Sequence, residues 1–250
     1  MSRFKRTVAA LAACLLVVGA VGCGGGGGGG DAGSQPDDTA REITNEHLAQ
    51  MVLALVDFGP EYRLFAPSEE NGAQTLEDRV DEDIDPQGEQ EDLAEFRWAS
   101  GFDQFFFSSE AVQQPSATFL VGSGLDIFAS GDDASAYFKD DRSESEDLAG
   151  KGDEDGVITG VDTFSVDVAD DGFGLVLSAI TDDNQSFWVL LVAVRKGRLM
   201  GEVGFGGTGD LPVAEKQRLI EKSRSLAAML DGKMGTVLAA VPAPDAAAGQ

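Results

Sequence analysis

The chain has 250 residues, of which 42% are hydrophobic and 15 are Phe, enough for one domain with a substantial core. Its 44 acidic and 18 basic side chains, with a single His, give a formal net charge of −26. Non-specific nucleic-acid binding needs a basic surface, so this charge excludes it. The same charge repels anionic lipid headgroups, so contact with a membrane would need a dedicated anchor.

The first 22 residues have the pattern of an export signal. Arg3, Lys5 and Arg6 form a basic start, and residues 8–22 are apolar and uncharged. This stretch is shorter than the ~20 residues that a membrane-spanning helix needs. It ends in Ala-Val-Gly-Cys at residues 20–23. This ending resembles the lipobox of bacterial lipoproteins, in which small residues precede a Cys that is acylated and becomes the mature N-terminus.

The resemblance implies that residues 1–22 are a lipoprotein signal peptide and that Cys23 is the lipidation site. It also implies an exported protein, anchored by its lipid to the cell membrane and facing the extracytoplasmic side. The other Cys, Cys14, lies in the segment expected to be removed, so the mature chain could form no internal disulfide. The alternative is a plain secretory signal cut near the same place, which would leave a free thiol on Cys23.

The composition divides the rest of the chain into three parts. Residues 23–42 are predicted to be the lipidated Cys and a Gly-rich tether, because seven glycines follow Cys23. A coil of this composition spans about 20–25 Å root-mean-square. Residues 43–233 are predicted to form a single α+β domain, and the Ala- and Pro-rich residues 234–250 to form a disordered tail.

The first half of the domain contains one clear helical pattern. A helix is predicted from a cap at Thr44 or Asn45 to a stop at Gly59-Pro60, because four apolar residues have helical spacing: Leu48, Met51, Val52 and Leu55. Residues 66–92 are predicted to be a long acidic loop, with Arg79 its only basic residue, and a short helix follows at about 93–100. Residues 101–108 and 117–130 have the composition of strands.

The second half predicts a helix, a run of strands and a closing helix. The helix covers about 132–148, with Asp132 and Asp133 at the positive end of its dipole. A half-buried strand is predicted from the alternation of Phe164, Val166 and Val168. Three more strands follow after short turns and form an antiparallel meander: 173–180, 187–194 and 198–205. The unbroken apolar run 187–194 should be a central strand covered on both faces. The last helix is predicted from Leu211 to about Leu230, ending at Asp231-Gly232.

These elements predict an α+β fold. It has one antiparallel sheet of five to seven strands, helices packed against one side, and a closing C-terminal helix. The element order loosely resembles the PsbP/Mog1-type sensor-like domains of bacterial surface lipoproteins. The resemblance rests on element order, and no motif residue carries it, so no functional residue transfers.

Gly204, Gly206 and Gly209 spell the G-x-G-x-x-G pattern of dinucleotide sites. That site needs a parallel βαβ unit, whereas these residues follow a strand of an antiparallel meander and no strand follows the last helix. Asp210 stands at the expected helix N-cap, where its carboxylate would occupy the anion position. The pattern is therefore interpreted as a joint between strand and helix, and no cofactor is predicted.

Asp81, Asp83 and Asp85 are spaced as in a calcium loop, but Pro86 stands where that loop needs Gly. A solvated acidic loop is the main interpretation, with weak Ca²⁺ binding as the alternative. His47 is interpreted as a surface residue of the first helix. Ser123 lacks the spacing of a nucleophile elbow, so no catalytic residue is assigned.

Two further features indicate possible contact surfaces. At least one of the three rings at Phe105, Phe106 and Phe107 could line a pocket or interface, because side chains alternate across a strand. The last helix has a basic side that could approach an anionic envelope surface or an acidic partner; its members are Lys216, Arg218, Lys222 and Arg224.

The sequence thus predicts a non-catalytic module that binds a protein or small-molecule partner outside the cytoplasm. One alternative is an envelope-associated hydrolase whose carboxylates the sequence does not single out. Another is a purely structural envelope protein.

Overall fold

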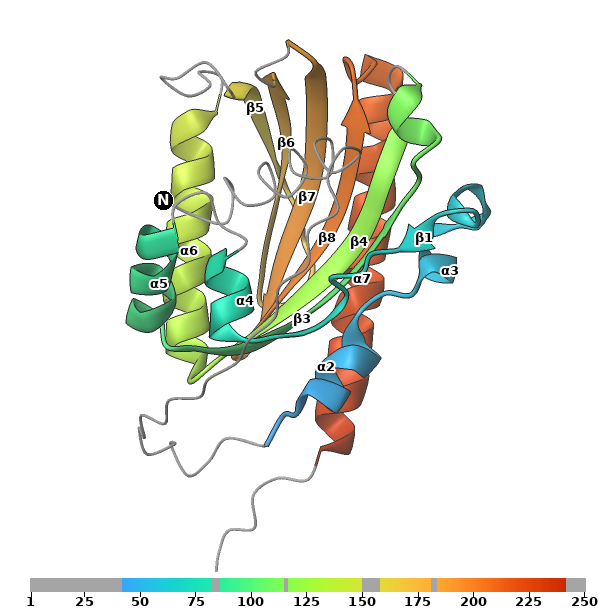
Figure 1. The fold of residues 1–250 in the computed structure, drawn as a ribbon. Coiled ribbons are helices and arrows are strands. Elements are labelled where there is room, and N and C mark those ends of the chain that lie inside the picture. Colours follow the sequence, from blue (N-terminus) through green and yellow to red (C-terminus); the bar gives the residue numbers. More distant parts are fainter. Residues whose placement is uncertain (1–41, 82–85, 115–116, 150–157, 181–183, 242–250) are drawn as a thin grey trace, which may run out of the picture.

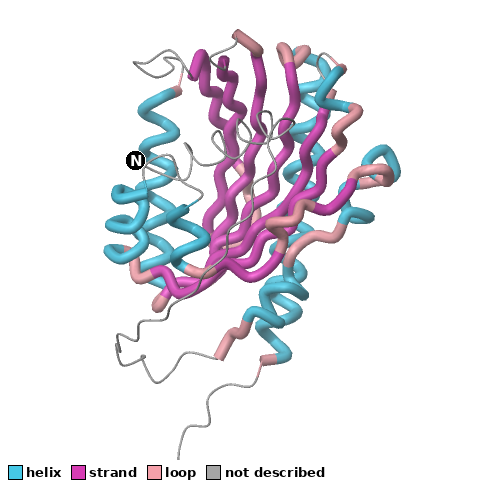
Figure 2. The backbone as a smooth tube through the Cα atoms, viewed as in Figure 1, coloured by secondary structure: helices cyan, strands magenta, loops and turns pink. Residues whose placement is uncertain are grey.

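The structure, a computed structural model, describes residues 42–81, 86–114, 117–149, 158–180 and 184–241. A single eight-stranded antiparallel sheet forms its centre, with helices on both sides (Figures 1 and 2). The long helix α7 closes the described chain. The predicted α+β class, the antiparallel sheet and the closing helix are confirmed.

The strands are β1 (Ala66–Pro67), β2 (Gly72–Gln74), β3 (Trp98–Phe107), β4 (Thr118–Phe128), β5 (Ile158–Ser165), β6 (Asp171–Ile180), β7 (Ser186–Lys196) and β8 (Leu199–Thr208). Their order is β1-β3-β4-β8-β7-β6-β5, and β2 also pairs with β3. The predicted meander is confirmed as β5 to β8, in which each strand pairs with the next. The sheet exceeds the expected five to seven strands because the short β1 and β2 add to the edge at β3.

The α-helices are α2 (Asn45–Met51), α3 (Leu55–Phe58), α4 (Leu76–Asp81), α5 (Pro86–Glu95), α6 (Gly131–Leu148) and α7 (Val213–Ala240). Two short 3₁₀ helices accompany them, η2 (Pro60–Tyr62) and η3 (Ala111–Gln113). The predicted helix at 132–148 is confirmed as α6, with Ser130 as its N-cap.

The helices cover both faces of the sheet, so the expectation that they lie on one side is wrong. We call the two sides the α7 face, which α2 and α7 cover, and the α6 face, which α6 covers. Strand β7 shows the reason, because its apolar side chains alternate between the two cores. Trp188, Leu190, Val192 and Val194 pack on the α7 face, whereas Phe187, Val189, Leu191 and Ala193 pack on the α6 face. The prediction of a central strand buried on both sides is confirmed, and each side needs its own helical cover.

The expected first helix is broken into α2 and α3. Thr44 is its N-cap, as predicted, but Val52 is extended and ends α2. Met51, Val52 and Leu53 are all buried, and three consecutive residues cannot share one face of a helix. The backbone N–H of Leu53 instead donates a hydrogen bond of 2.8 Å to the Ser123 hydroxyl on β4.

The predicted acidic loop at 66–92 is wrong, because this region contains β1, β2, α4 and most of α5. Pro86 begins α5, a position where its missing N–H costs nothing. The short helix expected at 93–100 is also wrong. Helix α5 ends at Glu95, Arg97 turns the chain with a φ of 49°, and Trp98 begins strand β3.

Two predicted boundaries are corrected in the second half. Strand β5 begins at Ile158 and ends at Ser165, so Val166 and Val168 follow the strand rather than lie in it. Helix α7 passes through Asp231-Gly232 and ends at Ala240. It continues because Met234 is fully buried in the core of the α7 face, with Val237 and Leu238 packed against that core. Residues 234–240, assigned to a tail, are therefore helical.

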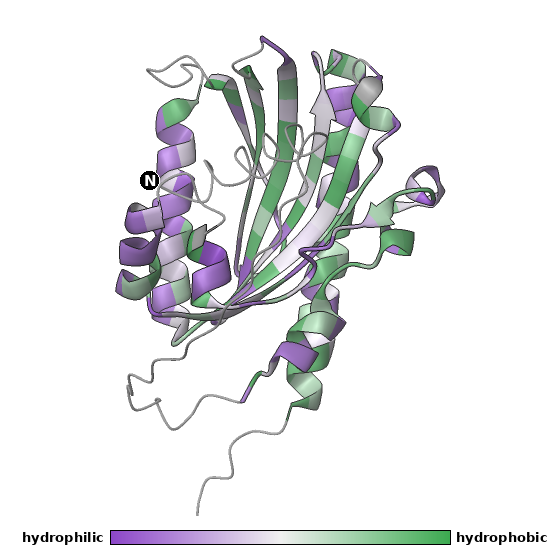
Figure 3. Ribbon diagram, in the orientation of Figure 1, coloured by the Kyte–Doolittle hydropathy of each residue, from purple (hydrophilic) through white to green (hydrophobic). Residues whose placement is uncertain are grey.

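Polar residues dominate the helices of the α6 side, as the hydropathy colouring shows (Figure 3). Among the described helices, none is long and apolar enough to cross a membrane.

Candidate functional site

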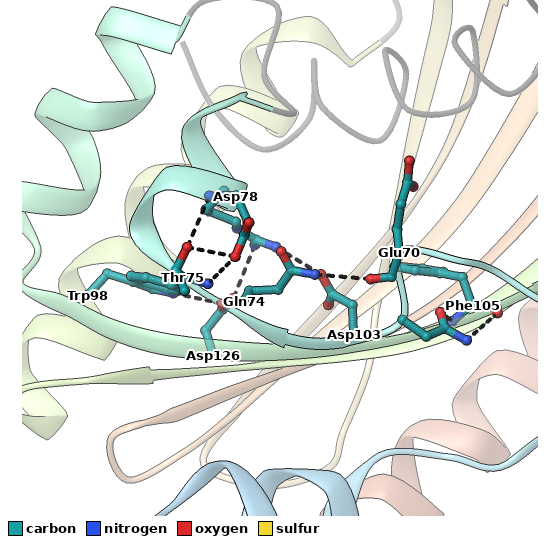
Figure 4. Close-up of polar contacts among 10 residues, drawn as sticks. Glu70, Gln74, Thr75, Asp78, Trp98, Asp103, Phe105 and Asp126 are labelled. Carbon is teal, nitrogen blue, oxygen red and sulfur yellow. Dashed lines mark hydrogen bonds and ion pairs between the residues drawn. The ribbon is translucent and has the colours of Figure 1, made fainter. Parts of the chain in front are cut away.

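A buried ion cluster joins helix α4 to the α6 face of the sheet (Figure 4). The guanidinium of Arg79, on α4, lies 3.3 Å from the carboxylate of Asp103 on β3 and 3.3 Å from that of Asp126 on β4. The three side chains are 10%, 11% and 3% exposed. The planar fork of an arginine can bind two carboxylates at once, which the single ammonium of lysine does less well.

Glycines on the neighbouring strand make room for both carboxylates. Asp103 is the cross-strand partner of Gly124, and Asp126 is the partner of Gly101. The Asp103 carboxylate fills the space of a side chain on Gly124, and a Cβ on Gly101 would lie 2.8 Å from Asp126 Oδ1. The ring nitrogen of Trp98 donates a 2.7 Å hydrogen bond to Asp126 Oδ1.

Local hydrogen bonds hold helix α4 at this position. The Thr75 hydroxyl accepts from the backbone N–H of Asp78 at 3.2 Å, and Asp78 Oδ2 accepts from the backbone N–H of Thr75 at 2.9 Å. These reciprocal bonds cap the start of the helix. Hydrogen bonds from the Thr75 side chain and backbone hold the pKa of Asp78 below its ordinary value.

The segment before α4 is fixed to strand β3 by a side chain. The Asn71 amide bonds the backbone of Phe105 in both directions, donating to its carbonyl at 2.9 Å and accepting from its N–H at 2.6 Å. Gln74, which is buried, donates to the carbonyl of Glu70 at 3.3 Å. The segment that carries Arg79 is therefore positioned at several points.

A small recess lies beside the ion cluster. Its cavity volume is about 30 Å³, on a scale where one water molecule occupies roughly 10–15 Å³. Its walls are mainly apolar, and Glu202 supplies a carboxylate; the lining residues are Phe105, Leu120, Ser123, Gly124, Val189, Leu191, Glu202, Gly204 and Phe205. Glu202 and Asp103 pair with the same residue, Gly124, from opposite sides, which places the recess next to the cluster.

The recess extends over Gly204, whose Cβ position is open. A Cβ at Gly204 would meet only ordinary contacts, the nearest being Leu191 Cδ1 at 3.6 Å. At the neighbouring Gly122, by contrast, the ring of Phe105 already fills the corresponding space. Phe105 is half-buried and lines the recess, so the prediction that one ring of the 105–107 run lines a pocket is confirmed.

The G-x-G-x-x-G residues are placed differently from the expected joint. Gly204 and Gly206 lie inside β8, which continues to Thr208 because it pairs with both β4 and β7. Only Gly209 turns the chain, with a φ of 70°, and its N–H bonds the Ser186 carbonyl at 2.7 Å. The N-cap of α7 is Pro212 and not Asp210, so that prediction is wrong.

His47 and Ser123 have structural contacts. The His47 ring nitrogen Nδ1 accepts from the backbone N–H of Thr44 at 3.1 Å and completes the cap of α2. The Ser123 hydroxyl is buried and accepts from Leu53, as described above.

The predicted lipidation and metal residues lie at the limits of the described chain. Cys23, Asp83 and Asp85 are outside the described residues, and Asp81 is the last residue of α4. Within the described ranges, no three His, Cys, Asp or Glu side chains come together as a metal site. Lipidation and weak Ca²⁺ binding stay predictions.

No protein-family model and no curated protein matches the sequence. Among solved structures, the chain is similar to the extracellular domain of PknH from Mycobacterium tuberculosis, with 12% identity and a TM-score of 0.48. The similarity covers 82% of this chain and 100% of that one. No residue role transfers at this identity, and the resemblance to PsbP/Mog1-type domains stays a prediction.

Proposed function

We propose that the protein is a lipid-anchored extracytoplasmic module that binds a partner without catalysing a reaction. The observation that carries the proposal is the Ala-Val-Gly-Cys sequence at residues 20–23, behind a basic start and an apolar stretch. Together they have the form of a lipoprotein export signal.

The recess over Gly204 is the proposed contact point for the partner. A cavity of about 30 Å³ accepts the tip of one side chain rather than a whole metabolite. Its apolar walls suit an apolar side chain of a partner protein.

The ion cluster does not have the arrangement of a hydrolytic carboxylate pair. A carboxylate pair that hydrolyses a substrate keeps one member protonated as the general acid. Arg79 instead contacts both carboxylates and stabilises the negative charge of each. We therefore assign the cluster to holding helix α4 on the sheet beside the recess.

The anchor is tested by changing each cysteine in turn. Cys23→Ala should move the protein from the membrane fraction to the soluble fraction and abolish labelling with an alkyne-bearing palmitate. Cys14→Ala is the matched control, because it makes the same change in the signal segment and should leave attachment intact. Retention of the Cys23→Ala protein in membranes would overturn the proposal.

The contact point is tested by cross-linking in cells. A photoreactive amino acid at position 202 should form a defined adduct, and Gly204→Ala should weaken it because the added methyl group occupies much of the recess. Gly160→Ala is the control, since that glycine lies on β5 with nothing within 4 Å of its Cβ position. If the adduct forms equally well in Gly204→Ala and in Gly160→Ala, the recess is not the contact point.

A further inference from the structure

The two helical layers of the protein differ strongly in charge. Helices α4, α5 and α6 together carry fourteen acidic and three basic side chains, a formal charge of −11. Helix α7 carries five basic and three acidic side chains, a formal charge of +2. With residues 42–65, which include four acidic residues and one basic residue, the α7 layer reaches only −1. In a chain of net charge −26, the α7 layer, counted as helix α7 and residues 42–65, is therefore almost neutral.

Among the described residues, most of the large apolar side chains that are exposed to solvent lie in this almost neutral α7 layer. Val56 is 81% exposed on α3, Leu64 is 83% exposed after η2, and Val213 and Met229 are 77% and 42% exposed on α7. The remaining one, Leu76, lies on α4 on the opposite side of the sheet and is 43% exposed.

Ion pairs fix the α3–η2 segment against helix α7. Lys233 bonds the Asp57 carboxylate at 2.8 Å and the Val52 carbonyl at 3.1 Å. Lys222 forms an ion pair with Glu61 and lies 4.6 Å from the centre of the Tyr62 ring. Val56, Leu64 and Met229 therefore lie in one layer that these ion pairs hold together. The same pairs neutralise much of the charge of the layer.

The chain enters the domain on this same side. Helix α2 is the first described element, and its Leu48 and Met51 pack in the core of the α7 face. Only residues 24–41 separate Cys23 from this part of the chain. A tether of this length confines the domain near its anchor, where an effective concentration in the millimolar range makes even weak contacts effective.

We infer that the outer surface of the α7 layer docks on the bilayer that holds the anchor, with Val56, Leu64 and Met229 at the headgroup level. The inference rests on the membrane attachment proposed above. Anionic headgroups repel the −11 layer and tolerate the −1 layer, so the charge difference orients the domain. The apolar side chains gain by leaving water at the interface. The recess and the ion cluster then face away from the membrane, toward a partner.

Hydroxyl-radical footprinting of the vesicle-bound protein tests this orientation. Residues 23–250, which include every described residue, are coupled through the Cys23 thiol to a maleimide lipid in phosphatidylethanolamine–phosphatidylglycerol vesicles. Oxidation of Leu64 should fall about threefold relative to the uncoupled protein, because docking removes most of its accessible surface. Leu76 is the matched control, since it has the same chemistry on the opposite side, and its oxidation should not change.

Two results would overturn the inference. One is that coupling to vesicles changes the oxidation of Leu64 and of Leu76 to the same extent. The other is protection of Leu64 that appears without vesicles and grows with protein concentration, which would assign the surface to a second copy of the chain. Because the coupling is chemical, neither result depends on whether cells acylate Cys23, and a failure of the Cys23→Ala test leaves this experiment valid.

Surface variants provide a second measurement. Val56→Asp combined with Leu64→Asp should restore the oxidation of Met229 on vesicles, because buried carboxylates are costly at an interface. Both positions are highly exposed, so the fold should tolerate the change. Ser143→Asp, on the exposed side of α6, should leave Met229 protected.

Discussion

The carboxylate of Asp103 occupies the space in which Gly124 would carry a side chain. The glycine on β4 therefore determines where the acid on β3 can lie, and the acid in turn positions Arg79 and helix α4. The geometry of the ion cluster therefore depends on the absence of a side chain at Gly124.

We predict that Gly124→Ala destabilises the protein. The added Cβ displaces Asp103 from Arg79, and disrupting a buried ion pair costs about 3 kcal/mol. The measurement is the free energy of unfolding from urea titration. Gly204→Ala is the matched control on the same face of the adjacent strand, where the new methyl group meets only ordinary contacts. A loss of stability as large in Gly204→Ala would contradict the packing described for the recess.

Ser123→Ala should loosen the connection between α2 and α3. The Leu53 N–H is buried and donates to the Ser123 hydroxyl, so the variant leaves a buried donor without its partner at a cost of about 2 kcal/mol. Hydrogen exchange at the Leu53 amide should accelerate together with a lower free energy of unfolding. Ser225→Ala, at an exposed position of α7, should change neither quantity. Unchanged exchange at Leu53 in Ser123→Ala would show that this bond does not hold the segment.

Met234→Ala should cost about 3 kcal/mol of stability, because it opens a cavity in the core of the α7 face. Met229→Ala makes the same change on the same helix at a position that is 42% exposed, and it should cost less than about 1 kcal/mol. Thermal and urea unfolding of the two variants measure the difference. Equal stabilities would indicate that residues 234–240 do not pack as a helix.

Acid should weaken two ion pairs of helix α7, one between Lys222 and Glu61 of η2 and one between Arg218 and Glu215 within the helix. A hydrogen bond from Lys222 lowers the pKa of Glu61, and one from Arg218 lowers the pKa of Glu215, both from an ordinary value of 4.5. A carboxyl whose pKa is lower in the folded state stabilises the fold above its unfolded pKa and loses that effect as the pH falls through the folded value. The contribution is therefore present at neutral pH and declines as the pH falls below about 4.5.

The pH dependence is measured with the double variant Glu61→Gln and Glu215→Gln. Its free energy of unfolding should fall less steeply than that of the wild type as the pH decreases below 4.5. Both pairs are partly exposed, so high salt should reduce the difference. Identical slopes for the double variant and the wild type would contradict the role of these pairs.

The sequence was informative where a pattern is local. Short turns between alternating or apolar runs predict the meander, and the apolar run of β7 predicts its central position. Helix α4 was missed although its cap was visible in the sequence, since Thr75 and Asp78 have the spacing of a capping box. The many acidic residues around it led to the prediction of a loop. The local cap nevertheless stabilises a helix there.

The site itself depends on strand register, which the sequence does not display. In the sequence, nothing distinguishes Asp103 and Asp126 from the rest of the 44 acidic residues. The pairing of β3 with β4 places each of them opposite a glycine. Gly204 was conspicuous because of its motif, but its open Cβ position follows from pairing with β4 and β7. These residues could be recognised as a site only once the pairing of strands that are distant in the sequence was known.

The pairing of β4 with β8 joins two segments that are far apart in the sequence. The β5–β8 meander consists of local hairpins, whereas β4 meets β8 only after the whole of β5, β6 and β7 has been made. Contacts between segments far apart in the sequence form slowly. In the proposed export with the N-terminus first, β4 would wait outside the cytoplasm with one edge unpaired until β8 had crossed. An anchor at the N-terminus would keep each waiting chain at the membrane, apart from others whose open edges could pair with it.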